Sequence, residues 1–147
     1  MQRAKDVQVK VAQTEQEMEG ARAVRRRVFI EEQGVPAEEE YDEHDGAAVH
    51  VVAVHDGAVI GTGRVFAQER GEARIGRMAV DLLWRRARVG SRLLTALEQE
   101  ARRLGLGRAV LHAQKYVHAF YLGHGYAPEG PTFMEAGIEH VTMKKLL

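Results

Sequence analysis

The stretch from Ala73 to Leu104 constrains the fold most, because it joins a strand pattern to a helix pattern through an arginine-rich turn. The strand pattern ends at Met78, Ala79 and Val80. The helix pattern carries apolar residues at helical spacing, namely Leu93, Leu94, Leu97, Ala101 and Leu104. An apolar run from Ala109 to Ala113 follows, so this part of the chain predicts a right-handed strand–helix–strand crossover between parallel strands.

The turn between strand and helix has the features of an anion site. It ends in Gly90 and Ser91, where free backbone N–H groups and the positive end of the helix dipole are expected to point at one spot. Such a spot binds phosphate groups. Gly90 presents no side chain there, and four arginines add positive charge: Arg85, Arg86, Arg88 and Arg92. The alternative is an ordinary connection with a solvated basic surface.

Two common phosphate loops are absent from the sequence. No segment reads Gly-x-x-x-x-Gly-Lys-Ser/Thr, and neither glycine pair continues to the third glycine of a dinucleotide fingerprint. Gly61 and Gly63 fall inside a strand pattern, whereas Gly105 and Gly107 follow a helix, where the first glycine serves as a C-terminal cap.

Length and charge bound the function classes. A chain of 147 residues fits one domain with a sizeable core. Lys plus Arg and Asp plus Glu both total 21, so no nucleic-acid or membrane partner is expected from net charge. The chain has no cysteine, no apolar run long enough to span a bilayer and no signal-peptide pattern in residues 1–11. We therefore expect a cytoplasmic protein.

The remaining patterns complete an α/β fold. A capping box at Thr14 and Glu17 begins a first helix, which Gly34 and Pro36 end. The expected strands and second short helix lie at residues 7–11, 48–55, 58–67 and 117–124, with closing strands from Tyr126 onward. Asp56-Gly57 and residues 68–71 make the hairpin turns. We predict a mixed, mostly antiparallel central sheet flanked by helices on both faces.

Three groups of polar residues remain after this assignment. Arg22, Arg25, Arg26 and Arg27 are expected to form a solvated helix face. The acidic run AEEEYDEHD, residues 37–45, is expected to be a loop, either a solvated linker or a negative rim that attracts a cationic amine. The seven histidines show no H-E-x-x-H spacing, so no metal site is expected.

Two motifs in order resemble the Gcn5-related N-acetyltransferase (GNAT) superfamily. Its pyrophosphate loop reads Gln/Arg-x-x-Gly-x-Gly/Ala; Arg85 and Gly90 match it, and Arg88 replaces the central glycine. Its later signature reads Asn-x-x-Ala-x-x-Phe-Tyr-x-x-x-Gly-Phe/Tyr. Four positions of this second signature match, Phe120, Tyr121, Gly125 and Tyr126, while Gln114 and Val117 replace the asparagine and the alanine.

Further stretches are similar to the ElaA/YjcF-like branch of that superfamily. They are residues 28–36 with the acidic run that follows, residues 111–114 and residues 133–140. The similarity covers nearly the whole chain in the right order, and it implies a single GNAT-type acetyltransferase domain over residues 1–147.

The resemblance implies an N-acetyltransferase that moves an acetyl group from acetyl-CoA to a primary amine by direct attack in a ternary complex. The expected cofactor-binding residues are Met78, Ala79 and Val80 along the pantetheine arm, Arg85, Arg86, Ala87, Arg88, Val89, Gly90 and Ser91 at the pyrophosphate, and Gln114. The partner is a small-molecule amine acceptor, the chain could form a homodimer, and no metal takes part.

The transfer reaction needs an acid and a base. Tyr121 is the expected acid. Glu32 is the expected base, with His112 behind it and a water chain equally open. A non-catalytic acyl-CoA-binding sensor remains an alternative, although such a sensor would not need Tyr121.

Overall fold

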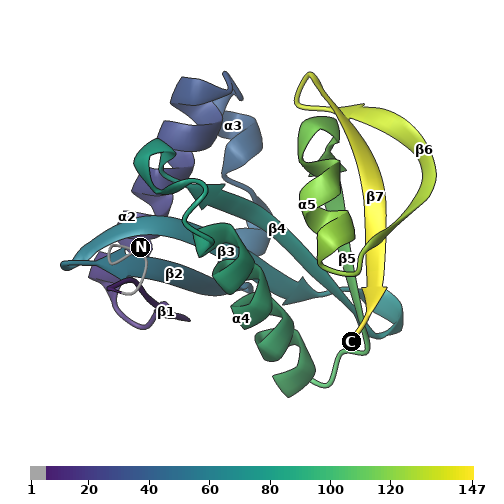
Figure 1. Cartoon of the computed structure of the whole chain (residues 1–147), viewed down its shortest axis with the longest axis horizontal. Coiled ribbons are helices and arrows are strands. Elements are labelled where there is room, and N and C mark those ends of the chain that lie inside the picture. The colour runs from purple at the N-terminus through teal and green to yellow at the C-terminus, as the bar shows by residue number, and fades with distance from the viewer. Residues whose placement is uncertain (1–5) are drawn as a thin grey trace.

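Seven strands form one sheet in the order β1-β2-β3-β4-β5-β7-β6 in the computed structural model, which describes residues 6–147 (Figure 1). All neighbours are antiparallel except β4 and β5, which are parallel as predicted. The strands are β1 (Gln8–Val11), β2 (Val49–His55), β3 (Ala58–Ala67), β4 (Glu72–Val80), β5 (Arg108–Gln114), β6 (Ala127–Glu135) and β7 (Ile138–Leu146).

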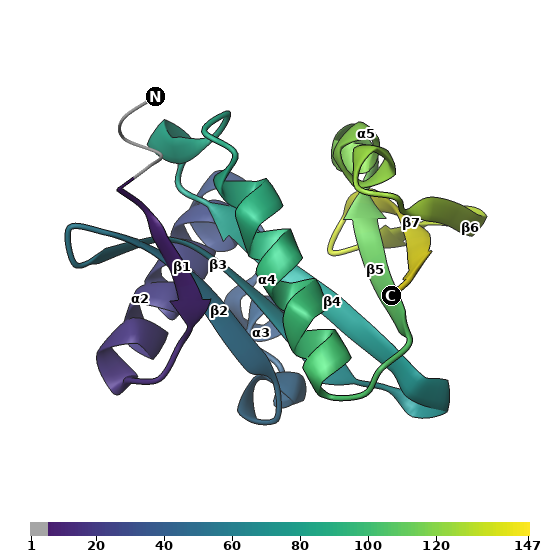
Figure 2. The ribbon, with the colours of Figure 1, turned by 60° about the horizontal axis from the view of Figure 1, so that its bottom comes forward.

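Helices cover both faces of the sheet, which confirms the predicted fold class. Figure 2 shows α4 in front of β1–β4 and the α2 and α3 segments behind them. The helical segments are α2 (Glu15–Arg25), η1 (Arg26–Glu32), α3 (Ala37–Glu40), η2 (Glu43–Gly46), η3 (Glu69–Gly71), η4 (Leu82–Trp84), α4 (Val89–Arg103), η5 (Lys115–Val117) and α5 (His118–Gly123). Gly105 follows α4 with a φ of +78°, as expected for a C-terminal cap.

The two faces have separate apolar cores. Leu93, Leu94 and Leu97 of α4 are fully buried against β2, β3 and β4. Val24 and Val28 pack on the other face with Ala79 of β4. α4 packs very close to β3, since an added Cβ at Gly63 would lie 2.7 Å from the Leu97 side chain. Glycine is therefore needed inside this strand for packing rather than for binding phosphate.

β4 and β5 pair over only a short length. Their parallel register joins Glu72, Ala73 and Arg74 to residues 108–110, and beyond Arg74 no register pair joins the strands. β4 also has a bulge, because Arg64 of β3 pairs with Gly76 and Thr62 pairs with Ala79. Arg77 lies in this bulge with a φ of +51°. The sheet is thus divided into two halves that separate toward the carboxyl ends of β4 and β5.

The first helix begins and ends as predicted, but its last turns are wider. Both hydrogen bonds of the Thr14–Glu17 capping box are present. From Arg26 to Glu32 the backbone is π-helical, with the Gln33 N–H donating to the Val28 carbonyl, and Gly34 then turns the chain with a φ of +75°. This wider turn places Glu32 beside Arg85 and Gln33 beside Gln114 of β5.

Two predictions about charged segments were wrong. The acidic run is not a loop, since it forms the short helical segments α3 and η2. Arg25 does not belong to a solvated face, because its side chain is only 2% exposed. Its guanidinium donates to Glu40 at 2.5 Å and to Asp45 at 2.8 Å, so the acidic run folds around an internal cation.

Candidate active site

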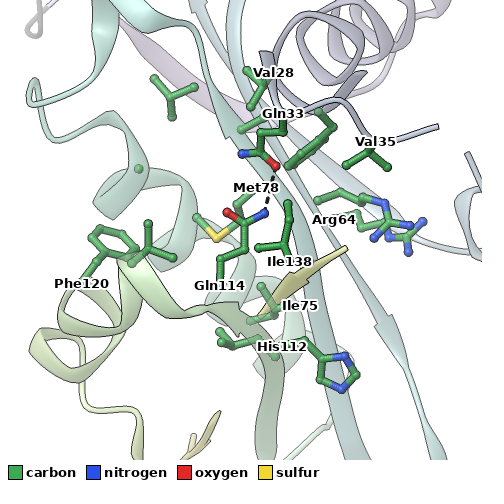
Figure 3. Close-up of a pocket in the computed structure, with 18 of the residues that line it drawn as sticks. Val28, Gln33, Val35, Arg64, Ile75, Met78, His112, Gln114, Phe120 and Ile138 are labelled. Carbon is green, nitrogen blue, oxygen red and sulfur yellow. Dashed lines mark hydrogen bonds between the residues drawn. The ribbon is translucent and has the colours of Figure 1, made fainter. Parts of the chain in front are cut away.

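A pocket of about 940 Å³ opens where β4 and β5 separate. Its walls come from the bulged half of β4, from β5, from the η1 segment, from the turn before α4 and from the β6–β7 hairpin. Figure 3 shows Met78 of β4, Gln114 of β5 and Phe120 of α5 around one space. This single pocket contains residues of the arginine-rich turn at one end and polar residues of the strands at the other.

The turn before α4 has the backbone of an anion site. Arg86 and Arg88 adopt left-handed conformations with φ of +70° and +63°, and Arg88 is the N-cap of α4. Both side chains line the pocket, and neither has an ion pair within residues 6–147. The first N–H groups of a helix of this length, together with two cations, favour an anion at this end of the pocket.

The conformation of Arg88 explains the glycine of the family motif. A positive φ suits glycine, and an arginine adopts it at a cost of about 1 kcal/mol. Arg88 therefore keeps the backbone shape of the loop while adding a charge.

The other expected loop residues have different surroundings. Val89 is buried in the core and Ala87 packs against it. A Cβ on Gly90 would contact the Phe120 ring at 3.6 Å. The Ser91 hydroxyl hydrogen-bonds to His124 Nε2 at 2.9 Å.

Arg85 and Glu32 form a bidentate ion pair. The two guanidinium nitrogens donate to the carboxylate at 2.7 and 2.8 Å, and Arg85 Nε also donates to the Val80 carbonyl. The hydrogen bonds from Arg85 lower the pKa of Glu32. A carboxylate in this state is a weaker base, and the structure brings Arg85 to Glu32 rather than leaving it free at the turn.

Tyr121 lies at the centre of the pocket. Its hydroxyl donates to Met78 Sδ at 3.6 Å, and its ring packs edge-on against Phe120 and Tyr126. Burial raises its pKa to about 12, so the phenol is protonated at neutral pH. Met78 and Val80 border the same space, while the Ala79 side chain is buried on the α2 side.

A pair of glutamines spans the pocket. Gln114 Nε2 of β5 donates to Gln33 Oε1 beyond η1 at 2.9 Å, as the dashed line in Figure 3 shows, and Gln33 Nε2 donates to the Tyr116 hydroxyl. Gln114 stands where the family motif has asparagine. Its amide joins β5 to the residue that follows η1, across the opening of the pocket.

The far end of the pocket is lined by charged and imidazole side chains. Arg74 of β4 donates to His112 Nδ1 of β5 at 2.9 Å, and Glu135 of β6 lies 3.0 Å from the same nitrogen. Arg64 and Arg77 also line this end, and both pair with Asp42. No three metal-binding side chains group together anywhere in residues 6–147. No helix among these residues is long and apolar enough to cross a membrane.

Comparison with known proteins decides the family. Residues 7–147 match the family described as "Acetyltransferase (GNAT) domain". The chain belongs to the GNAT acetyltransferase family. It is 36% identical over 136 residues to YjcF of Bacillus subtilis, an uncharacterised N-acetyltransferase, with 92% of this chain and 96% of YjcF covered.

Two solved structures share this fold. Escherichia coli ElaA is similar with a TM-score of 0.81 at 20% identity, covering 95% of this chain and 99% of that one. An acyl-CoA N-acyltransferase from Pseudomonas aeruginosa is similar with a TM-score of 0.79 at 27% identity, covering 95% and 98%. This GNAT protein therefore lies in the ElaA/YjcF-like branch.

Among the residues of the pocket wall that sequence reasoning missed are Arg74, Glu135 and Gln33. Arg74 and Glu135 belong to strand patterns, in which alternation predicts only which face a side chain occupies. Gln33 reaches the pocket through the π-helical turn, which has no signature in this sequence. The polar residue at each of these positions was the only available signal.

Proposed function

We propose that this protein transfers an acetyl group from acetyl-CoA to a primary amine by direct attack in a ternary complex. The observation that carries the proposal is the continuity of the pocket, which joins the positively charged helix end to a polar chamber past the Tyr121 hydroxyl. A donor with a phosphate group at one end and a reactive thioester at the other fits such a shape. The Pseudomonas relative named as an acyl-CoA N-acyltransferase supports this donor class.

The residues of the donor end fit the phosphates of coenzyme A. Arg86 and Arg88 supply charge that no carboxylate among residues 6–147 pairs with, and the start of α4 supplies backbone N–H groups. The bulge in β4 at Arg77 interrupts the ladder next to Met78, which leaves backbone groups available to hydrogen-bond an extended pantetheine arm. We assign Met78, Val80 and Gln114 to that arm.

The amine nitrogen attacks the thioester carbonyl carbon, the C–S bond breaks, and the sulfur takes a proton from the Tyr121 hydroxyl. The proton that the nitrogen releases as the amide forms restores this hydroxyl. Before the attack, a base must take one proton from the ammonium group of the acceptor. We propose His112 for this task rather than Glu32, because Glu32 is held by Arg85 whereas His112 lines the pocket beside Glu135. A chain of water molecules is the other route.

The sensor alternative needs the donor end alone. It gives no reason for a partly buried phenol against Met78 or for a polar chamber beyond it. Transfer is therefore the function that the geometry supports better.

The donor assignment is tested by binding. We expect acetyl-CoA to raise the melting temperature, and Arg86→Gln together with Arg88→Gln to weaken its binding about tenfold or more through lost charge-assisted bonds. S-acetylpantetheine, which lacks the phosphates of coenzyme A, should bind both proteins equally. Arg103→Gln at the exposed end of α4 serves as the control.

Equal acetyl-CoA affinity in the double variant would contradict the assignment of this turn to the phosphates. Transfer itself is tested by CoA release with a panel of amines. Binding of acetyl-CoA without release for any amine would favour the sensor.

A further inference from the structure

Three acidic side chains near the His112 end of the pocket, which we take as the acceptor end, are already neutralised. Glu40, Asp42 and Asp45 pair with Arg25, Arg64 and Arg77 at distances of 2.5 to 3.1 Å. Glu40 is buried and the two aspartates are mostly covered. These three side chains therefore do not provide a free negative charge that would attract a cationic amine.

Arg74 is the cation of this region that lacks such compensation. It lines the pocket, and within residues 6–147 no carboxylate lies at ion-pair distance from it. Its hydrogen bond goes to His112 Nδ1, a neutral acceptor, so the other N–H groups of its guanidinium remain for a ligand. Burial lowers the pKa of Arg74, which indicates that its charge is poorly solvated.

Glu135 provides an opposite charge on the other side of the same imidazole. Both Arg74 Nη2 and Glu135 Oε1 lie within 3.0 Å of His112 Nδ1, so the two groups are no more than about 6 Å apart. A single ring nitrogen either carries a hydrogen for Glu135 or offers a lone pair to Arg74. One of the two charged groups is therefore left without its hydrogen bond to His112.

We propose that the acceptor is a zwitterionic amine, an amino acid or a compound with a carboxylate a few bonds from its amino group. The carboxylate binds Arg74, and the ammonium group binds beside Glu135 and His112. This inference rests on the proposed acetyl transfer and adds the chemical class of the acceptor. A planar carboxylate matches the fork of the guanidinium, and the two ends of the ligand match the two charges in sign and spacing.

Binding of the carboxylate would also prepare His112 as a base. When Arg74 donates to Nδ1, the neutral ring carries its hydrogen on Nε2 and cannot accept a proton there. A carboxylate that draws Arg74 away leaves Nδ1–H to donate to Glu135, and the lone pair of Nε2 becomes available. The acceptor thus favours the tautomer that its own deprotonation needs.

The test compares matched acceptors. CoA release is measured with amino acids, with the corresponding amino acid amides and with the corresponding amines that lack the carboxyl group. We expect kcat/KM to be about ten- to a hundredfold higher for the carboxylates, the range of a charged hydrogen bond made with a buried partner. Equal values for the acid and the amide would overturn the proposal.

Variants locate the preference. Arg74→Gln should raise KM for the amino acid about ten- to a hundredfold and should not raise KM for the amide, whereas Arg103→Gln on the surface should alter neither. Arg74→Lys keeps the charge and should retain part of the preference, which covers the case in which Arg74→Gln folds poorly. An equal loss for acid and amide would mean that Arg74 is structural only and would reject the assignment.

A binding measurement separates this inference from the proposed function. The melting temperature of the protein, saturated with an acetyl-CoA analogue, is measured in the presence of an amino acid or of its amide. Protection by the acid alone would support the acceptor site even if no CoA were released, and release without any preference for the acid would support transfer while rejecting the zwitterion.

Discussion

Tyr121 is a partly buried phenol whose hydroxyl has a weak partner, the sulfur of Met78. Its pKa, raised to about 12 by burial, keeps the proton in place across the physiological range. The residue can therefore donate once to a developing thiolate without any change in its surroundings.

Tyr121→Phe should lower the rate of transfer by about a hundredfold or more, the scale of one positioned acid, while acetyl-CoA affinity and melting temperature change little. Phe keeps the ring contacts with Phe120 and Tyr126. The measurement is single-turnover transfer at several pH values, because product release can mask the chemical step. An unchanged single-turnover rate would reject Tyr121 as the acid.

Arg88 combines a strained backbone with a charge at the donor end. Arg88→Gly should leave the free energy of unfolding within about 1 kcal/mol, because relief of the left-handed strain offsets the greater freedom of the unfolded chain. At low salt the variant should bind acetyl-CoA more weakly than the parent protein does, and this difference in affinity should shrink as salt is raised. Equal affinity at low salt would show that the backbone alone holds the phosphates.

Motif spacing predicted residues that the structure brings to one pocket, namely Gly90, Phe120 and Tyr121, because each motif is local in sequence. The Arg85–Glu32 pair and the Arg74–His112–Glu135 group join residues far apart in the chain, and no local pattern reports such contacts. Arg25 was misjudged because a helical face of arginines is usually solvated, whereas here one of them meets two carboxylates.

At the scale of elements, α3 and η2 are held by ion pairs more than by apolar contacts. Hydrogen bonds from Arg64 hold the pKa of Asp42 well below its ordinary value. Burial opposes the same shift at Asp45, but bonds from Arg25 and Arg64 still lower its pKa. Burial raises the pKa of Glu40 against the pull of Arg25 and Arg77, so Glu40 contributes with the opposite sign.

The lowered pKa values of Asp42 and Asp45 predict that the stability of the protein depends on pH. A depressed pKa contributes stability that is fully present above the unfolded value of about 3.9 and is lost as pH falls below it. Asp42→Asn should lower the free energy of unfolding by about 1–3 kcal/mol at neutral pH and flatten the loss between pH 4 and pH 2. Denaturant unfolding at each pH measures this.

Glu43→Gln is the matched control on the same segment, because Glu43 is 88% exposed and should leave the profile unchanged. If Asp42→Asn showed the same loss below pH 4 as the parent protein, the network would not be the origin of the acid sensitivity.

The order of helices and strands could be predicted because apolar periods and turn residues are local signals. The conformation of the acidic run could not be predicted, since its short helical turns depend on arginines contributed by α2, β3 and β4. The bulge at Arg77 was also invisible, because it reflects a mismatch between β3 and β4 rather than a property of either strand.

In the whole molecule, only three register pairs of β4 and β5 join the two halves of the sheet within residues 6–147, and the Gln33–Gln114 bond crosses the opening beyond them. A ligand that lies between β4 and β5 should therefore reduce the local unfolding of these two strands. Acetyl-CoA at about a hundred times its dissociation constant should add about 2.7 kcal/mol to the free energy of unfolding.

In a hydrogen-exchange experiment, the added protection should be concentrated in residues 76–80 and 111–114. The fragment 3′-phospho-ADP, which reaches the turn before α4 but not the strands, is the comparison ligand and should protect the start of α4 alone. Equal protection of the strands by both ligands would contradict the placement of the pantetheine arm.

Gly61 and Gly63 determine how far the start of α4 lies from the sheet. An added methyl group at Gly63 would meet Leu97 at 2.7 Å and Met78 at 3.2 Å, and one at Gly61 would meet Leu93 at 3.1 Å. A larger residue at either position would lift the helix, and with it the backbone groups proposed to hold the phosphates. Substrate recognition in this protein is therefore sensitive to mutations in a buried strand that no substrate atom needs to reach.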